Sequence, residues 1–280
     1  MEILRTCAEL REWSRWERND GGNTIGLVPT MGALHAGHAS LIRAARESTA
    51  FVAVSIFVNP TQFGPHEDFA RYPRSFDADC ALAKAEGARV IFAPSVEEMY
   101  PAGAASFVEV GGLSDRLDGH SRPGHFRGVA TVVAKLFIAS EADRAFFGQK
   151  DAAQVGVLRR MAVDLRLATE IVVCPIVRET DGLAMSSRNV YLSPAERTQA
   201  IALSRAVRQA EELCAVGQRS AATLIAVASE ILAAEPAIRV DYVELVDWAT
   251  LLPVESARPG TLFAVAAWMG ATRLIDNTVF

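Results

Sequence analysis

The stretch that decides the fold is Pro29–Leu41, which reads P-T-M-G-A-L-H-A-G-H-A-S-L. A run with β character, residues 24–28, leads into it, and a helical pattern over residues 39–47 leaves it. Gly32 and Gly37 lack a Cβ, so a ligand can approach the backbone closely at both. The first N–H groups of a helix have no partner within it and attract anions. The loop is therefore predicted to hold a nucleotide phosphate.

Two histidines, His35 and His38, fall where this loop becomes the helix. Imidazoles at such a place can hydrogen-bond to phosphate oxygens or neutralise them. A Walker A loop is excluded because His38 and Ala39 stand where Lys-Ser/Thr is required. A dinucleotide-binding fingerprint is also excluded, because no G-x-G-x-x-G follows the first strand. A zinc pair lacks an obvious third ligand. The loop alone leaves two interpretations open, a phosphate site and a pair of helix-start hydrogen bonders.

Composition narrows the class of protein. The chain has 280 residues, enough for one large or two modest domains, and its net charge of −5 argues against a protein that coats nucleic acid. Its four cysteines are scattered without a C-x-x-C, which predicts reduced thiols and a cytoplasmic location. We expect no signal peptide, because the N-terminus lacks a charged region followed by an apolar stretch. We expect no membrane segment, because no apolar run reaches about 18 residues.

Short apolar runs alternate with helical patterns through the first two-thirds of the chain. The runs are apolar at consecutive positions and rich in Val, Ile or Phe, which is typical of parallel strands covered on both faces. This alternation predicts an α/β fold with a doubly wound parallel sheet, which binds ligands at the carboxyl ends of its strands. The expected strands are residues 24–28, 51–58, 89–93, 145–147 and 170–177, and the expected helices are residues 39–47, 76–86, 128–138 and 151–164.

The pattern changes after about residue 177. Ser193 and Glu196 form a capping box with Pro194 at the first helical position, which predicts one long helix that ends near Val216. A second helix and three strands, the last of them weak, are expected at residues 221–234, 240–246, 262–268 and 272–275. We therefore expect a first domain at residues 1–177 and a small α+β domain at residues 178–280.

Polar side chains follow two other expected strands. Asn59 and Gln62 offer amide groups among apolar neighbours, which suits a small ligand with hydroxyls and a carboxylate, although Asn59-Pro60 could also be a simple turn. After the strand that ends at a glycine, Lys150 is a mobile charge able to reach phosphate. Asp151 could cap the helix, bind through magnesium or accept from a ribose hydroxyl, and Gln154 lies one turn further along the same face.

A third group lies on a loop. Ser186, Ser187 and Arg188 combine two hydroxyls with a guanidinium, which could close over a triphosphate or form only a surface turn. The basic segment 122–128 could add charge to a pocket or only cap a helix. No serine or cysteine lies in a G-x-S-x-G elbow, which favours direct attack of a bound substrate on a nucleotide phosphate. One carboxylate could help to hold Mg²⁺, and the candidates are Asp68, Asp77 and Asp79.

In their order and spacing, these blocks resemble the pantothenate synthetases (pantoate–β-alanine ligases), a family of the nucleotidylyltransferase superfamily with a HIGH-type signature. The resemblance extends from about Thr24 to Asn277. The matching blocks are P-T-M-G-A-L-H-A-G-H, V-S-I-F-V-N-P-T-Q-F, R-Y-P-R, R-P-G-H-F-R-G-V-A-T-V-V-A-K-L-F, F-G-Q-K-D and G-L-A-M-S-S-R-N.

The resemblance implies a fold, a reaction and partners. It implies a Rossmann-like N-terminal domain, a small C-terminal lid domain and a homodimer. Pantoate would attack the α-phosphate of ATP, with Mg²⁺ present, to give pantoyl adenylate and pyrophosphate. The amine of β-alanine would then attack the acyl carbon and release AMP. A simple nucleotidylyltransferase acting on another small acceptor is the alternative, and it would leave AMP attached to that acceptor.

The same resemblance assigns roles to residues of this chain. His35 and His38 would contact the phosphates, and Lys150, Ser186, Ser187 and Arg188 would stabilise their charge. Met31, Gly37 and Gly148 would line the nucleotide site, with Asp151 near the ribose. Gln62 and Gln154 would hold pantoate, with Asn59 nearby, and Asp79 is the best candidate for magnesium. The sequence departs from the family pattern at Gln149, Ala153 and Asp118, where the family commonly has Glu, Gln and Glu.

Overall fold

A computed structural model describes residues 1–19, 21–65 and 67–280 of the chain, and these divide into two units. The N-terminal unit comprises Met1–Gly148 and Val157–Cys174, and the C-terminal unit comprises Gln149–Gly156 and Pro175–Phe280. The division therefore passes through the helix α7, Ala152–Asp164. No helix within the described residues is long and apolar enough to cross a bilayer.

The N-terminal unit is built on a six-stranded sheet in which every paired strand is parallel. This confirms the predicted α/β fold. The strand order is β1-β4-β3-β2-β5-β6. After β2, the strands β3 and β4 are added on one side of it, and β5 and β6 are then added on its other side. The strands are β1 (Glu2–Leu4), β2 (Ile25–Thr30), β3 (Phe51–Ile56), β4 (Val90–Phe92), β5 (Arg144–Gly148) and β6 (Glu170–Cys174).

Because the chain changes direction here, the boundary between β2 and β5 is the topological switch point of the sheet. β2 pairs with β3 from Ile25↔Phe51 to Thr30↔Ile56 on one side and with β5 at Gly26↔Arg144 on the other. Ligands of open parallel sheets bind outside the carboxyl ends of the strands at this point. The loop after Thr30 and the glycine at the end of β5, Gly148, lie at those ends.

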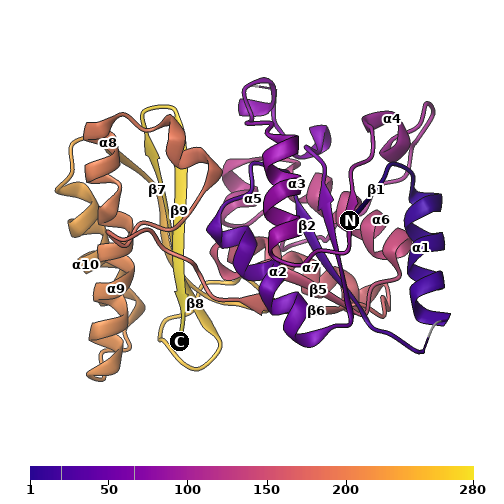
Figure 1. Ribbon diagram of the computed structural model, residues 1–280. Coiled ribbons are helices and arrows are strands. Elements are labelled where there is room, and N and C mark those ends of the chain that lie inside the picture. The colour runs from indigo at the N-terminus through magenta and orange to yellow at the C-terminus, as the bar shows by residue number, and fades with distance from the viewer. Residues whose placement is uncertain (20, 66) are drawn as a thin grey trace. The chain divides into compact units, whose positions relative to one another are not determined.

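Helices cover both faces of the sheet because its strands are apolar on both (Figure 1). Leu41, Ile42 and Ala45 of α2 pack in one cluster with alternate strand residues such as Val28. On the opposite face, Phe147 of β5 meets Phe137 of α6 edge to face, with ring centroids 6.4 Å apart. The helices are α1 (Cys7–Asn19), α2 (Ala36–Ser48), α3 (Phe76–Ala85), α4 (Val96–Met99), α5 (Asp118–Ser121) and α6 (His125–Ser140).

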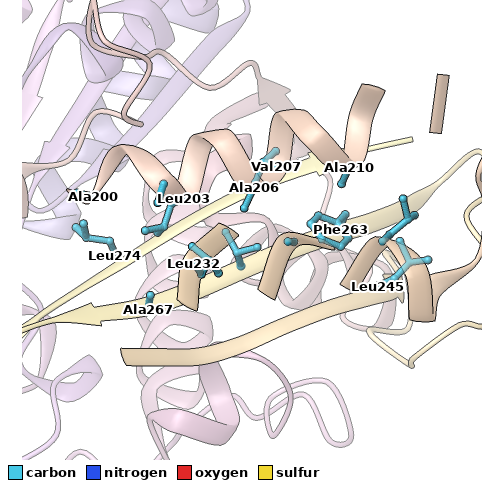
Figure 2. Packing of buried hydrophobic residues seen from close by; sticks show 14 of the residues in the cluster. Ala200, Leu203, Ala206, Val207, Ala210, Leu232, Leu245, Phe263, Ala267 and Leu274 are labelled. Atoms are coloured by element: carbon cyan, nitrogen blue, oxygen red, sulfur yellow. The ribbon is translucent and has the colours of Figure 1, made fainter. Parts of the chain in front are cut away.

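The C-terminal unit has an antiparallel sheet in the order β7-β8-β9, with β7 at Ile238–Asp247, β8 at Thr261–Met269 and β9 at Thr272–Val279. Helices α9 (Ile201–Ala215) and α10 (Ala221–Ala233) cover one face of it (Figure 1). Figure 2 shows their shared core, in which Leu203, Ala206 and Val207 of α9 lie toward the Phe263 ring of β8. The weak third strand is therefore present, and it is longer than the sequence indicated.

The single long helix predicted from Pro194 to Val216 is wrong. The capping box is present, since the Glu196 N–H donates to Ser193 Oγ over 3.3 Å, but α8 ends at Gln199 and α9 begins at Ile201. At the buried Ala200 between them, the carbonyl accepts from the Leu203 N–H over 3.1 Å, which is an i to i+3 bond. This tight turn interrupts the α-helical ladder for one residue.

Candidate active site

The loop that leaves β2 is held in shape by one carboxylate. Gly32 and Ala33 both have positive φ, at 82° and 50°, which turns the N–H groups of Ala33 and Leu34 toward α3. Asp79 on α3 accepts both, over 2.9 Å and 2.8 Å, and also accepts from Ser75 Oγ over 3.0 Å. A Cβ at Gly32 would lie 2.9 Å from the same carboxylate. Asp79 thus fixes the loop that carries the histidines.

The side chains of His35 and His38 together cap the start of α2. His35 is the N-cap, and its Nδ1 accepts from the Gly37 N–H over 3.1 Å. His38 Nδ1 accepts from the His35 N–H over 3.3 Å, which completes a capping box made of two imidazoles. Because each Nδ1 is an acceptor, the proton of each neutral ring is at Nε2. The two interpretations of the sequence are therefore compatible, since capping directs both Nε2–H groups away from the helix backbone.

Asp79 remains a predicted magnesium ligand, but its surroundings fit that role poorly. Its side chain is 2% exposed, and both oxygens already accept hydrogen bonds from the protein. Within residues 1–19, 21–65 and 67–280, no group of three His, Cys, Asp or Glu side chains is arranged to hold a metal ion. Mg²⁺ commonly needs only one or two protein carboxylates beside substrate phosphates and water.

Beyond β3, Asn59 supports Gln62 within the short helix η1, Pro60–Gln62. Asn59 is 1% exposed, and its Nδ2 donates to Gln62 Oε1 and to the Gly128 carbonyl, each over 3.1 Å. Its Oδ1 accepts from Tyr100 Oη over 2.8 Å. Gln62 in turn donates from Nε2 to the Met31 sulfur over 2.9 Å. The structure thus brings three predicted site residues together, and Asn59 orients the Gln62 amide.

The basic segment 122–128 forms the support of this turn. The Gln62 carbonyl accepts from His125 Nδ1 over 2.8 Å and from Arg122 Nη2 over 3.3 Å, and Arg122 also pairs with Glu67 over 2.5 Å. A Cβ on Gly128 would lie 2.3 Å from the Thr61 carbonyl oxygen, so only glycine allows α6 to approach η1 this closely. The segment therefore supports the turn beneath Gln62.

The contacts of His125 define its protonation state. Arg122 Nη1 can only donate, so His125 Nε2, 3.0 Å away, must accept, and the ring proton is at Nδ1. Burial, together with the charge of Arg122, lowers the pKa of His125 from 6.5 to about 4. The imidazole is therefore neutral at physiological pH and acts as a fixed hydrogen-bond donor. Nothing in the sequence pattern separated this histidine from a helix cap.

In the C-terminal unit, Lys150 and Asp151 belong to the short helix η3, Gln149–Asp151, and their side chains pair over 3.2 Å. The Asn277 amide nitrogen donates to the carbonyls of Gln149 and Lys150, over 2.9 Å each. Gln149 departs from the family pattern, and its side chain donates back to Asn277 Oδ1 over 3.3 Å. Gln154 lies half-buried one turn further, on α7.

The serine and arginine loop starts from a small hairpin of the same unit. The Met185 N–H donates to the Val177 carbonyl over 3.0 Å and closes this hairpin directly before Ser186. Ser186 Oγ accepts from the Arg188 N–H over 3.2 Å and caps the short helix η4, Ser187–Tyr191. The three candidate side chains are half-buried and lie on consecutive residues of one cap and one turn.

The predicted site residues therefore fall into two groups, one in each unit. Met31, His35, Gly37, His38, Asn59, Gln62, Asp79 and Gly148 belong to the N-terminal unit. Lys150, Asp151, Gln154, Ser186, Ser187 and Arg188 belong to the C-terminal unit. The sequence did not single out Tyr100, Arg178 or Asp276, and Asp276 lies just beyond the strand expected at residues 272–275, so no local pattern marked it.

We expect Asp79→Asn to weaken the fold itself. An amide cannot accept both loop N–H groups through two oxygens, so one buried donor loses its partner, at a cost of about 1–3 kcal/mol in the free energy of unfolding. Urea unfolding without nucleotide or Mg²⁺ measures this, with the exposed Asp77→Asn on the same helix as the control. A variant as stable as the wild type that binds Mg²⁺-ATP more weakly would instead support the magnesium role.

We expect His125 to make the fold sensitive to acid. Its pKa is lower in the folded state than in the unfolded chain, so the stabilisation is complete above about pH 6.5 and is lost as pH falls toward 4. The free energy of unfolding should then fall by up to about 3 kcal/mol more in the wild type than in His125→Gln. Urea titrations at several pH values test this, with the exposed His120→Gln as the matched control. Parallel pH profiles for wild type and His125→Gln would contradict it.

Comparison with known proteins identifies the family. The model of the family described as pantoate-beta-alanine ligase matches residues 2–279. The chain is 61% identical to a pantothenate synthetase of Acidobacterium capsulatum over 92% of this chain and 87% of that protein. It is 54% identical to that of Koribacter versatilis, over 100% and 96% of the two chains.

Solved structures agree with this. A pantothenate synthetase from Thermus thermophilus is 46% identical, with a TM-score of 0.93 over 100% of this chain and 99% of that one. A pantoate-beta-alanine ligase from Francisella tularensis, complexed with β-γ ATP and β-alanine, is 31% identical with a TM-score of 0.80, over 100% and 97% of the chains. The resemblance seen in the sequence is confirmed: the chain belongs to the pantoate–β-alanine ligase family.

Proposed function

We propose that this protein joins pantoate to β-alanine at the expense of ATP and releases pantothenate, AMP and pyrophosphate. The observation that carries the proposal is the match to the ligase family across residues 2–279. The relative solved with β-γ ATP and β-alanine supports ATP and β-alanine as substrates. The pantoate carboxylate attacks the α-phosphorus, pyrophosphate leaves, and the amine of β-alanine then attacks the acyl carbon and expels AMP.

The N-terminal unit supplies directed hydrogen-bond donors for the first step. His35 and His38 donate from Nε2 to the phosphate oxygens, because their Nδ1 atoms accept from the backbone of α2. Gln62 holds pantoate with its amide, which Asn59 orients. Met31, Gly37 and Gly148 line the nucleotide. Donors fixed before the reaction stabilise the charge that develops on phosphate without having to reorganise.

The C-terminal unit supplies the cations. Lys150 and Arg188, with the hydroxyls of Ser186 and Ser187, neutralise the phosphate oxygens, and Asp151 approaches the ribose. In this scheme Lys150 exchanges its contact with Asp151 for the phosphate when ATP binds. Gln154 contacts pantoate from α7. Residues 1–177 would then bind nucleotide and pantoate, and residues 178–280 would act as a lid that keeps water from the adenylate.

We propose that Mg²⁺ enters with ATP and that the triphosphate and water provide most of its ligands. When bound, the ion neutralises part of the triphosphate charge. We also propose a cytoplasmic homodimer that binds neither nucleic acid nor membrane. Four cysteines without a disulfide and a net charge of −5 support the location and the lack of nucleic acid.

Pantoate-dependent exchange between ATP and pyrophosphate, without β-alanine, tests the first half-reaction. We expect His38→Ala and Lys150→Ala each to slow exchange by about 10²–10³-fold, because each removes one phosphate-directed group. His120→Ala and Lys84→Ala, at exposed positions, are the matched controls and should exchange like the wild type. Variants of His38 and Lys150 that exchange normally would show that these contacts are misassigned.

The products separate ligase from simple nucleotidylyltransferase. With β-alanine present, mass spectrometry should find pantothenate and free AMP in equal amounts. A nucleotide that stays attached to its acceptor would identify the alternative reaction.

A further inference from the structure

Two adjacent residues of β9, Asp276 and Asn277, are polar and almost fully buried. They are 1% and 3% exposed, and they pair with Val265 and Ala264 of β8. Successive side chains of a strand point to opposite faces of the sheet. The two residues therefore make separate sets of contacts, one from each side of β9.

Asp276 contacts the hairpin that precedes the serine and arginine loop. Arg178 forms a two-pronged pair with its carboxylate, over 2.6 Å and 2.9 Å, and also donates to the Gly182 carbonyl over 3.1 Å. Two parallel bonds between guanidinium and carboxylate fix direction as well as distance. The hairpin that ends at Met185, and with it the start of the Ser186–Arg188 loop, is thereby attached to β9.

Asn277 contacts the lysine segment. Both bonds that its Nδ2 makes are to backbone carbonyls, those of Gln149 and Lys150, and its Oδ1 accepts from the Gln149 side chain. The Asn277 amide thus holds the main chain of η3 at the residue that carries the Lys150 side chain. Neighbouring Asp276 Oδ1 accepts from the Asn277 N–H over 2.8 Å, which joins the two sets of contacts.

A half-buried ion pair on the same sheet has no connection to the candidate segments. Arg273 of β9 pairs with Asp241 of β7 over 2.8 Å, and their side chains are 11% and 17% exposed. Both residues lie along the sheet, and neither is in η3, the hairpin or η4. This pair provides a control for the loss of polar side-chain contacts in the same sheet.

We propose that Arg178, Asp276 and Asn277 form a clasp of positioning residues that sets Lys150 and the Ser186–Arg188 loop relative to each other for adenylyl transfer. The inference rests on the proposed function, in which these two segments act on the same triphosphate. The clasp residues act through Lys150 and the loop, and none of them is assigned a contact with substrate. A misplacement of about 1 Å can slow a reaction by about 10²-fold, so their effect is on rate.

Substitution of Asn277 in the full-length enzyme tests the clasp. We expect Asn277→Ala to slow pantoate-dependent ATP–pyrophosphate exchange by about 10–100-fold. Asn277→Asp should be as slow, because it keeps the shape of the side chain but offers no N–H. The KM for β-alanine should not change in either variant. Asp241→Asn should lower the melting temperature while it exchanges at the wild-type rate, and an equal slowing in Asp241→Asn would overturn the proposal.

A double variant shows whether Asn277 acts through Lys150. Lys150→Ala with Asn277→Ala should be no slower than Lys150→Ala alone, because a misplaced lysine matters only while it is present. Effects that multiply would overturn the proposal. A normal rate in Lys150→Ala would refute the proposed function itself, whereas a slow Lys150→Ala beside a normal Asn277→Ala would refute only the clasp.

Arg178→Lys covers the case in which the Asn277 variants do not fold. Lysine keeps the charge but cannot form the two-pronged pair, so exchange should slow by about 10-fold or more, while the matched Arg273→Lys exchanges normally. Equal rates in Arg178→Lys and the wild type would show that the pair between Arg178 and Asp276 does not position the Ser186–Arg188 loop.

Discussion

The loop after β2 depends on one constraint: backbone N–H groups that are turned away from regular structure must still find acceptors. Gly32 and Ala33 take left-handed conformations, which direct two successive N–H groups to the Asp79 carboxylate. Without this acceptor the loop would have buried, unpaired donors just before His35. The place of the histidines at the switch point of the sheet thus follows from a carboxylate more than forty residues away in sequence.

The same arrangement recurs at each candidate group, since a buried residue that has no assigned contact with substrate fixes one that does. His125 and Arg122 hold the carbonyl of Gln62, and Asn277 holds the carbonyl of Lys150. In each case the supporting residue bonds to the main chain of the candidate residue, which fixes where its side chain begins. Groups fixed in this way lose little entropy when substrate binds.

The sheet of the N-terminal unit was predictable because Val, Ile and Phe occupy consecutive positions in its central strands, as parallel strands buried on both faces require. β1 escaped prediction because Glu2 and Ile3 are exposed on a strand of only three residues. The break at Ala200 could not be predicted, since alanine favours helix and the interruption is a local change of hydrogen-bond partner.

The candidate site was only partly predictable for a related reason. Spacing singled out His35, His38, Lys150 and the serine loop as candidates, because they follow strands or begin helices, as groups that act on phosphate often do. The supporting contacts join residues distant in sequence, such as Arg178 with Asp276, and no local pattern encodes such a pairing. Sequence therefore suggested candidates for ligand contact more readily than the residues that hold those candidates in place.

The division inside α7 has a consequence for any attempt to take the protein apart. The chain passes between the two units after Gly148, after Gly156 and after Cys174, so no single linker joins them. A gene fragment that begins at Pro175 would encode all of β9 but none of the carbonyls that Asn277 serves. The C-terminal unit is complete only when residues 149–156, which comprise η3 and the start of α7, are supplied with it, so neither unit corresponds to one uninterrupted segment of the chain.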